Sequence, residues 1–134
     1  IGTPLEFVLE TVGVTEQIGV LLFGGPMMGQ AAASLEVAVT KGTSGIIVLN
    51  EDAQPARVYP CIRCARCVEA CPMLLNPAEL GLLARRAEFE RAEAQHLSAC
   101  FECGACAYVC PSHLPLVQEI RTAKAALKRQ ARYE

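Results

Sequence analysis

Two stretches of the sequence decide the fold: CIRCARCVEACP at residues 61–72 and CFECGACAYVCP at residues 100–111. Together they hold all eight cysteines of the chain, and each follows the pattern C-x2-C-x2-C-x3-C-P. Runs of this spacing bind two iron–sulfur clusters, with the fourth cysteine of each run ligating the cluster of the other run. The sequence therefore predicts two [4Fe–4S] clusters as its cofactors.

The spacing has a physical reason. Three thiolates at positions i, i+3 and i+6 of a tightly wound loop can point at one cuboid cluster, while the fourth iron needs a thiolate from elsewhere. A proline after the fourth cysteine ends the local helix. The predicted ligand sets are Cys61, Cys64, Cys67 and Cys110 for the first cluster, and Cys100, Cys103, Cys106 and Cys71 for the second.

Two other uses of the cysteines fit less well. A structural zinc site separates its C-x2-C pairs by a longer stretch than these crowded runs allow. A disulfide framework suits a short secreted chain, but no signal-peptide pattern is present here and 52% of the residues are apolar. Zinc and disulfide bonds thus remain the minor alternatives.

Composition narrows the class of protein. The net charge of −2 gives no nucleic-acid signature. Residues 18–35 carry no charge, but Gly24-Gly25-Pro26 interrupts any helix there, so a strand at 18–23 followed by a turn is expected rather than a membrane span. Acidic residues dominate positions 1–60 and basic residues dominate 115–134, which indicates different partners at the two ends.

Residues 1–52 are predicted to form a small α+β unit, followed by a linker at 53–60. Thr3 is placed to cap a helix with Pro4 at its first position, and Gly13 is expected to end it. Short strands are expected at 38–39 and 45–49, the second of them central in the sheet because it is wholly apolar.

Residues 61–134 are predicted to be helical. Asn76, Pro77 and Glu79 form a helix start, and the residues expected to face inward after it are Leu80, Leu83, Ala84 and Ala87. A C-terminal helix should bury Leu116, Val117, Ile120, Ala123 and Leu127. Helices between and after the runs indicate an α-helical ferredoxin domain, so the fold class expected is α+β.

Several segments, in this order, resemble the C subunit of the Rnf (also Rsx) electron-transport complex. They are GGPMMG at 24–29, VTK at 39–41, the strand at 46–49, PCIRC at 60–64 and the second run from Cys100. The resemblance covers essentially the whole chain. It implies a peripheral subunit of a complex on the cytoplasmic side of the bacterial inner membrane, which couples electron transfer between ferredoxin and NAD to ion translocation.

The resemblance also implies a cofactor-binding domain that is not part of these residues. The C subunit of Rnf has an upstream domain for FMN and NAD(H), and no such domain is seen here. Residues 1–50 resemble the later part of the β-grasp-like (SLBB) unit that follows it, without its opening strand. The chain, which begins at Ile1, is thus expected to be a fragment of a longer protein.

The function expected is electron transfer, with no catalytic residue in the chain itself; the parent complex would be the oxidoreductase and translocase. The alternatives are an iron–sulfur subunit of a dehydrogenase or heterodisulfide reductase, and a zinc-stabilised interaction module. The segment at 24–29 is not G-x-G-x-x-G, so it is interpreted as a turn rather than a nucleotide loop.

Other residues have secondary interpretations. His96 is expected on the surface rather than as a ligand, His113 is a minor candidate for tuning a cluster, and Met27 and Met28 are expected to pack. The first run carries Arg63 and Arg66 against Glu69, whereas the second run carries Glu102. Positive charge favours the reduced form of a cluster, so the first cluster is expected to have the higher reduction potential. One helix face should carry Arg121, Lys124, Lys128 and Arg132, either solvated or docked on an acidic surface.

Overall fold

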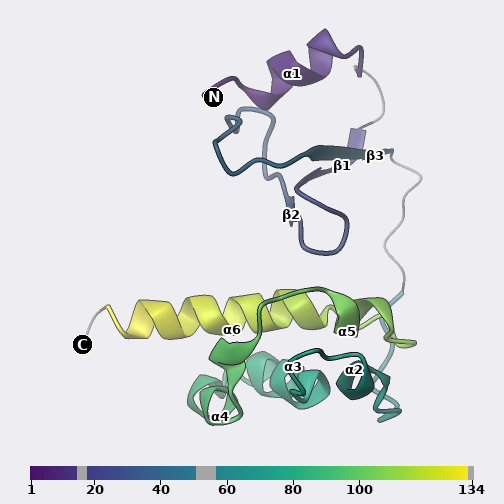
Figure 1. Ribbon diagram of the computed structural model, residues 1–134, viewed down its shortest axis with the longest axis vertical. Coiled ribbons are helices and arrows are strands. Elements are labelled where there is room, and N and C mark those ends of the chain that lie inside the picture. Colours follow the sequence, from purple (N-terminus) through teal and green to yellow (C-terminus); the bar gives the residue numbers. More distant parts are fainter. Residues whose placement is uncertain (15–17, 51–56, 133–134) are drawn as a thin grey trace. The chain divides into compact units, whose positions relative to one another are not determined.

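The computed structural model describes residues 1–14, 18–50 and 57–132 (Figure 1). It is an α+β chain of two compact units, residues 1–55 and residues 56–134. Part of the predicted linker, residues 53–56, lies outside the described residues. Residues 57–60 are exposed and form no helix or strand.

The first unit packs one helix, α1 (Leu5–Thr11), against a three-stranded antiparallel sheet. The strands are β1 (Ile18–Phe23), β2 (Gln30–Ala31) and β3 (Ile46–Asn50), in the order β2-β1-β3. The core consists of Leu5, Leu9 and Leu21. The strand at 18–23 is confirmed. The expectation that the later strand is central was wrong, because β3 lies at an edge and β1 lies between its two partners.

The start of α1 also differs from the prediction. Thr3 does not cap the helix, which begins at Leu5 with no side-chain cap. Residues 2–5 instead pair with the segment at 37–39: Val39 N–H donates to Thr3 O (2.8 Å) and Leu5 N–H donates to Val37 O (3.0 Å). This pairing holds the chain extended just before the helix. The strand expected at 38–39 is thus only an isolated bridge, between Ala38 and Pro4. Gly13, at φ 77°, follows the helix end as predicted.

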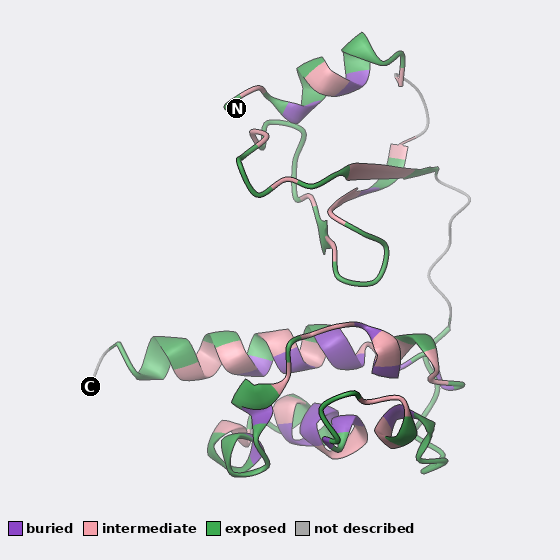
Figure 2. Cartoon of the chain, in the orientation of Figure 1, coloured by how far each residue is buried: buried purple, intermediate pink, exposed green. Residues whose placement is uncertain are grey.

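The second unit contains helices and, within its described residues, no strand. They are α2 (Arg66–Glu69), α3 (Pro77–Arg85), α4 (Phe89–Ala94), the 3-10 turn η1 (Leu97–Ala99), α5 (Ala105–Tyr108) and α6 (Leu116–Gln130). The long helix α6 packs along α3 and α4 (Figure 1). Buried residues gather in α3 and in the first half of α6, as predicted from their spacing (Figure 2).

The predicted helix start at Asn76 is confirmed. Asn76 Oδ1 accepts a hydrogen bond from Glu79 N–H (3.3 Å), and Pro77 occupies the first helical position. The helix is shorter than its apolar pattern suggests, because Ala87 has a left-handed backbone (φ 56°) that separates α3 from α4. Ala87 is therefore exposed, and its expected place on the inward face was wrong.

The two halves of this unit repeat one backbone plan. A shift of 39 in residue number carries Cys61 onto Cys100, α2 onto α5 and the start of α3 onto the start of α6. The same shift matches the residues with positive φ: Arg63 with Glu102, Ala65 with Gly104, and Leu74 with His113. The unit is thus an internal repeat whose two copies pack against each other.

Candidate metal centres

The eight cysteines line two small cavities of similar size. The first cavity is lined by Cys61, Cys64, Cys67 and Cys110, and the second by Cys100, Cys103, Cys106 and Cys71. In each case three cysteines come from one run and the fourth comes from the other run. These are the two groups of four that the sequence motif predicted.

Short local structures aim the thiols at the cavities. The first two cysteines of each run lie in a loop, and the third lies in a single helical turn, α2 or α5. Left-handed residues shape each loop, at Arg63 and Ala65 in the first run and at their equivalents in the second. Cys67 and Cys106 are buried, so each cavity has one thiol at its base.

The cavities fit a polynuclear iron–sulfur group. All eight cysteines are free thiols, the soft ligands that iron–sulfur clusters require. Across the described residues, no three Cys, His, Asp or Glu side chains converge closely enough to share one metal ion. Four thiols spread around a cavity suit a cuboid cluster, which is held at its corners, better than a single tetrahedral ion.

Burial affects the two innermost thiols. Burial raises the pKa of Cys67, against the lowering effect of the Ala78 backbone N–H. Burial, followed by the neighbouring charge of Cys100, raises the pKa of Cys106 to about 11. Both groups are therefore protonated at neutral pH without metal, and their protons leave when iron binds. The Ala78 amide lies in the first turn of α3, which places a helix start beside the first cavity.

Ser112 was not identified from the sequence, yet it ties the two runs together. Its buried hydroxyl donates to Pro60 O (2.9 Å), and its backbone carbonyl accepts from Tyr59 N–H (2.9 Å). These bonds hold the chain just before Cys61 against the chain just after Cys110. Residues 59–60, predicted as linker, are thus attached to the second unit. A serine directly after Cys-Pro was the available signal, but its partner lies far away in sequence.

The second run is braced by α6. Glu102 accepts from Arg121 Nε (2.6 Å) and from Lys124 Nζ (3.2 Å), and Lys124 Nζ also donates to Cys100 O. Partial burial alone would raise the pKa of Glu102, but the hydrogen bonds and charges of the two cations outweigh it and lower the pKa. Two of the four residues predicted on a solvated or docking face are therefore half-buried and paired within the chain.

The first run has different surroundings. Cys61 and Cys64 are exposed, as are Arg63, Arg66 and Glu69. Within the described residues, none of these three charged side chains forms an ion pair. The charge comparison made from the sequence was incomplete, because it counted Glu102 of the second run without the two cations that α6 supplies.

The remaining candidates lie away from the cavities or at their edge. His96 is exposed and lines neither cavity, in agreement with its predicted surface role. His113 is also exposed and lines neither cavity. The side chains of Met27 and Met28 are about half exposed, so their expected packing is not provided within the first unit.

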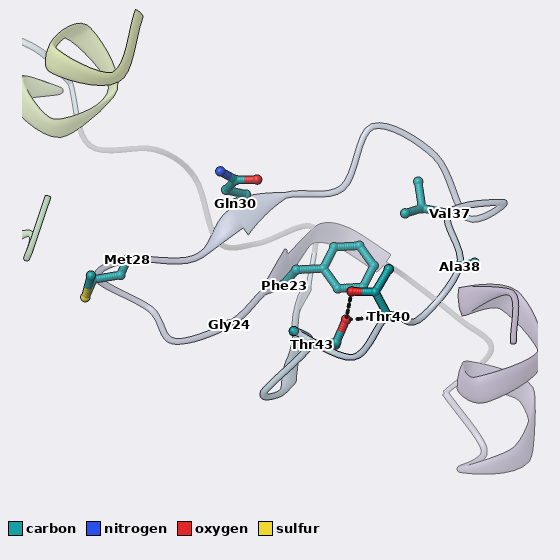
Figure 3. A pocket seen from close by; sticks show the side chains of 9 residues that line it. Phe23, Gly24, Met28, Gln30, Val37, Ala38, Thr40 and Thr43 are labelled. Atoms are coloured by element: carbon teal, nitrogen blue, oxygen red, sulfur yellow. Dashed lines mark hydrogen bonds between the residues drawn. The ribbon is translucent and has the colours of Figure 1, made fainter. Parts of the chain in front are cut away.

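A separate, open cavity lies in the first unit. Phe23, Thr40 and Thr43 form part of its wall, and Thr43 Oγ1 accepts from Thr40 N–H (3.1 Å) (Figure 3). Gly24 and Met28 of the GGPMMG loop also line it. The loop is tight: a Cβ on Gly29 would lie 2.5 Å from Gly25 O. The lining offers no cationic side chain to a phosphate group, which suits a turn better than a nucleotide loop.

Comparison with known proteins indicates the kind of metal centre in the second unit. Residues 60–114 match the family model of the 4Fe-4S dicluster domain. This match covers both cysteine runs and the α3–α4 region between them. The second unit therefore binds two [4Fe–4S] clusters.

Curated relatives cover nearly the whole chain. It is 45% identical over 98% of its length to the C subunit of the ion-translocating oxidoreductase complex of Rhodobacter capsulatus. It is 37% identical over 98% of its length to the C subunit of the Na(+)-translocating ferredoxin:NAD(+) oxidoreductase complex of Acetobacterium woodii, and 39% identical over 72% to the proton-translocating counterpart of Clostridium ljungdahlii. The chain spans 26%, 30% and 21% of these relatives, respectively.

The helices were also compared with the requirements of a membrane span. Among the helices of the described residues, none has both the length and the apolar character needed to cross a membrane.

Proposed function

We propose that this chain relays electrons through its two clusters within an ion-translocating oxidoreductase complex. The premise is that the chain belongs to the C-subunit family of such complexes over the region it covers. The observation that carries the proposal is the shared construction of the two cavities, each with three thiols from one run and one from the other. Two such sites in one packed unit would hold two one-electron centres side by side in the chain.

The proposed ligands are Cys61, Cys64, Cys67 and Cys110 for one cluster and Cys100, Cys103, Cys106 and Cys71 for the other. The lining of the two cavities supports this assignment. The clusters, when bound, take up and release single electrons. The protein holds the thiolates in place, provides apolar walls such as Leu114 and Leu75, and directs backbone N–H groups at sulfur.

The domain plan follows from the same premise. We assign the dicluster, α-helical ferredoxin domain to residues 57–134 rather than 61–134, because Tyr59 and Pro60 bond to Ser112. The first unit, with one helix on a small antiparallel sheet, is proposed as part of a β-grasp-like (SLBB) module. Any FMN or NAD(H) site would lie in other parts of the longer protein.

The proposed partners are other subunits of a membrane-associated complex, with no nucleic acid. Two relatives are named as ferredoxin:NAD(+) oxidoreductase subunits, which supports a place between those two electron carriers. We place the chain peripherally, on the cytoplasmic side of the bacterial inner membrane. Contact with the membrane would then be made through its partners.

The test is anaerobic reconstitution of the chain with iron and sulfide. Two [4Fe–4S] clusters should give matching iron and acid-labile sulfide contents, together with the broad visible absorption of iron–sulfur proteins that bleaches on reduction. In the intact complex, loss of the clusters should stop electron transfer between ferredoxin and NAD. A colourless protein that retains zinc, or a complex that keeps its activity without the clusters, would contradict the proposal.

A further inference from the structure

The contacts around Glu102 join α6 to the second cysteine run. Arg121 and Lys124 each bind one oxygen of the Glu102 carboxylate, at 2.6 Å and 3.2 Å. Lys124 also donates to the carbonyl of Cys100. The backbone N–H of Glu102 in turn donates to Cys100 Sγ (3.4 Å). The side chain and the backbone of one residue thus connect the α6 cations to a ligand sulfur.

The three charged side chains are largely removed from water, where a charge acts more strongly on its surroundings. The exposed fractions of the Glu102, Arg121 and Lys124 side chains are 25%, 22% and 18%. Charges that are mostly removed from water are screened less by salt and solvent than exposed ones. Two cations and one anion thus lie together beside the second cavity, of which Glu102 is a lining residue.

Among the described residues, the first run has no equivalent arrangement. Shifting the numbering by 39 places Arg63 on Glu102, Leu82 on Arg121 and Arg85 on Lys124. Arg63 is exposed, Leu82 has no charge, and Arg85 binds Glu119 (2.5 Å) instead of the cysteine loop. The charged contacts therefore distinguish two sites whose backbones are closely alike.

We propose that Glu102 and Lys124, with Arg121, are positioning residues that set the reduction potential of the second cluster independently of the first. The proposal rests on the cluster-binding function proposed above. Positive charge favours the more negative, reduced form of a cluster, and hydrogen bonds to its sulfurs act in the same direction. The α6 cations raise the potential of the second cluster, and the Glu102 carboxylate limits that rise while it holds the loop in place.

Two substitutions with opposite expected signs test this proposal. Glu102→Gln keeps the size of the side chain but removes the negative charge, so the potential of one cluster should rise. Lys124→Gln removes a positive charge, so the potential of the same cluster should fall. We expect each change to alter the reduced-to-oxidised ratio about tenfold at a fixed ambient potential, which is about 59 mV for a one-electron couple. The measurement is a redox titration of the cluster-loaded chain followed by electron paramagnetic resonance.

Three further variants serve as controls. Lys128→Gln changes an exposed charge one turn farther along α6, and Arg63→Gln changes the exposed equivalent of Glu102. Both variants should leave the reduction potential of the second cluster unchanged. Lys124→Arg keeps the charge and should restore the potential. Iron and sulfide contents, measured for every variant, show whether both clusters are present.

The outcomes separate this inference from the proposed function. If the wild-type chain holds no clusters, the proposed function fails and this inference falls with it. If both clusters are present but Glu102→Gln and Lys124→Gln shift the potential in the same direction, or not at all, the inference alone is overturned. Opposite shifts confined to one of the two clusters would support it.

Discussion

Cys61 and Cys64 of the first run are exposed, whereas Cys100 and Cys103, their equivalents in the second run, are half-buried. The backbones of the two runs repeat the same left-handed positions and the same single helical turn. Their surroundings differ because α6 carries Arg121 and Lys124, which bind the second run, where α3 carries Leu82 and Arg85.

This comparison separates two properties that the sequence determines: the positions of the thiols and the charges around them. The local motif sets the positions of the thiols, since it is repeated and both copies line a cavity. Residues about 20 positions downstream supply the charges that bind the second copy. Two sites of the same chemical class can thus be given different properties without any change in their ligands.

The largest expected effect comes from exchanging a fourth ligand. Cys110→Ser should remove the cluster of the first cavity, although Cys110 lies in the second run, and the chain should lose about half of its iron. Its remaining spectrum should match that of Cys61→Ser, since both changes leave the same cluster. Cys71→Ser should match Cys100→Ser in the same way. If Cys110→Ser instead resembled Cys100→Ser, each run would bind its own cluster.

Removal of iron should have the next largest effect, and it should be confined to one unit. One core cluster of the second unit includes the proposed ligands Cys67 and Cys106, together with Leu114, Leu116 and Val117. Without iron, no cluster joins the cysteines of this core to one another. Hydrogen-exchange protection of the backbone amides at 61–71 and 100–110 should therefore fall at least about tenfold. The first unit has its own core and should change little. Equal protection of the runs with and without iron would contradict this.

The sequence predicted what depends on local pattern. The cysteine spacing gave the two groups of four that line the cavities, and Asn76-Pro77 gave the start of α3. The predictions at Thr3 and the strand order failed because each depends on pairing with distant residues. Ser112 and the pairing of Glu102 with α6 were missed for the same reason: each partner is far away in sequence.

A smaller effect is expected at Ser112, which ties Cys110 to the chain before Cys61 and so supports the first cavity. Ser112→Ala removes the hydrogen bond to Pro60 O and should cost about 1 kcal/mol, so the midpoint of thermal cluster loss should fall. The first cluster should be lost earlier than the second, because only the bond from Tyr59 N–H to Ser112 O then ties the chain after Cys110 to the chain before Cys61. Met73 occupies the equivalent place in the first run and is exposed, so Met73→Ala should shift the midpoint little.

The smallest effect tests the repeated backbone itself. Ala65 and Gly104 occupy equivalent left-handed positions, at φ 61° and 88°. A left-handed backbone costs a residue with a Cβ roughly 1–2 kcal/mol, whereas glycine avoids that cost but loses about 0.5–1 kcal/mol more conformational entropy on folding. Gly104→Ala should therefore lower the midpoint of cluster loss, and Ala65→Gly should raise it, each by an amount equivalent to about 0.5–1 kcal/mol. Both midpoints can be followed by visible absorption at one fixed heating rate, because cluster loss is irreversible. A fall in both variants would mean that the side chain at 65 contributes packing that outweighs its backbone strain.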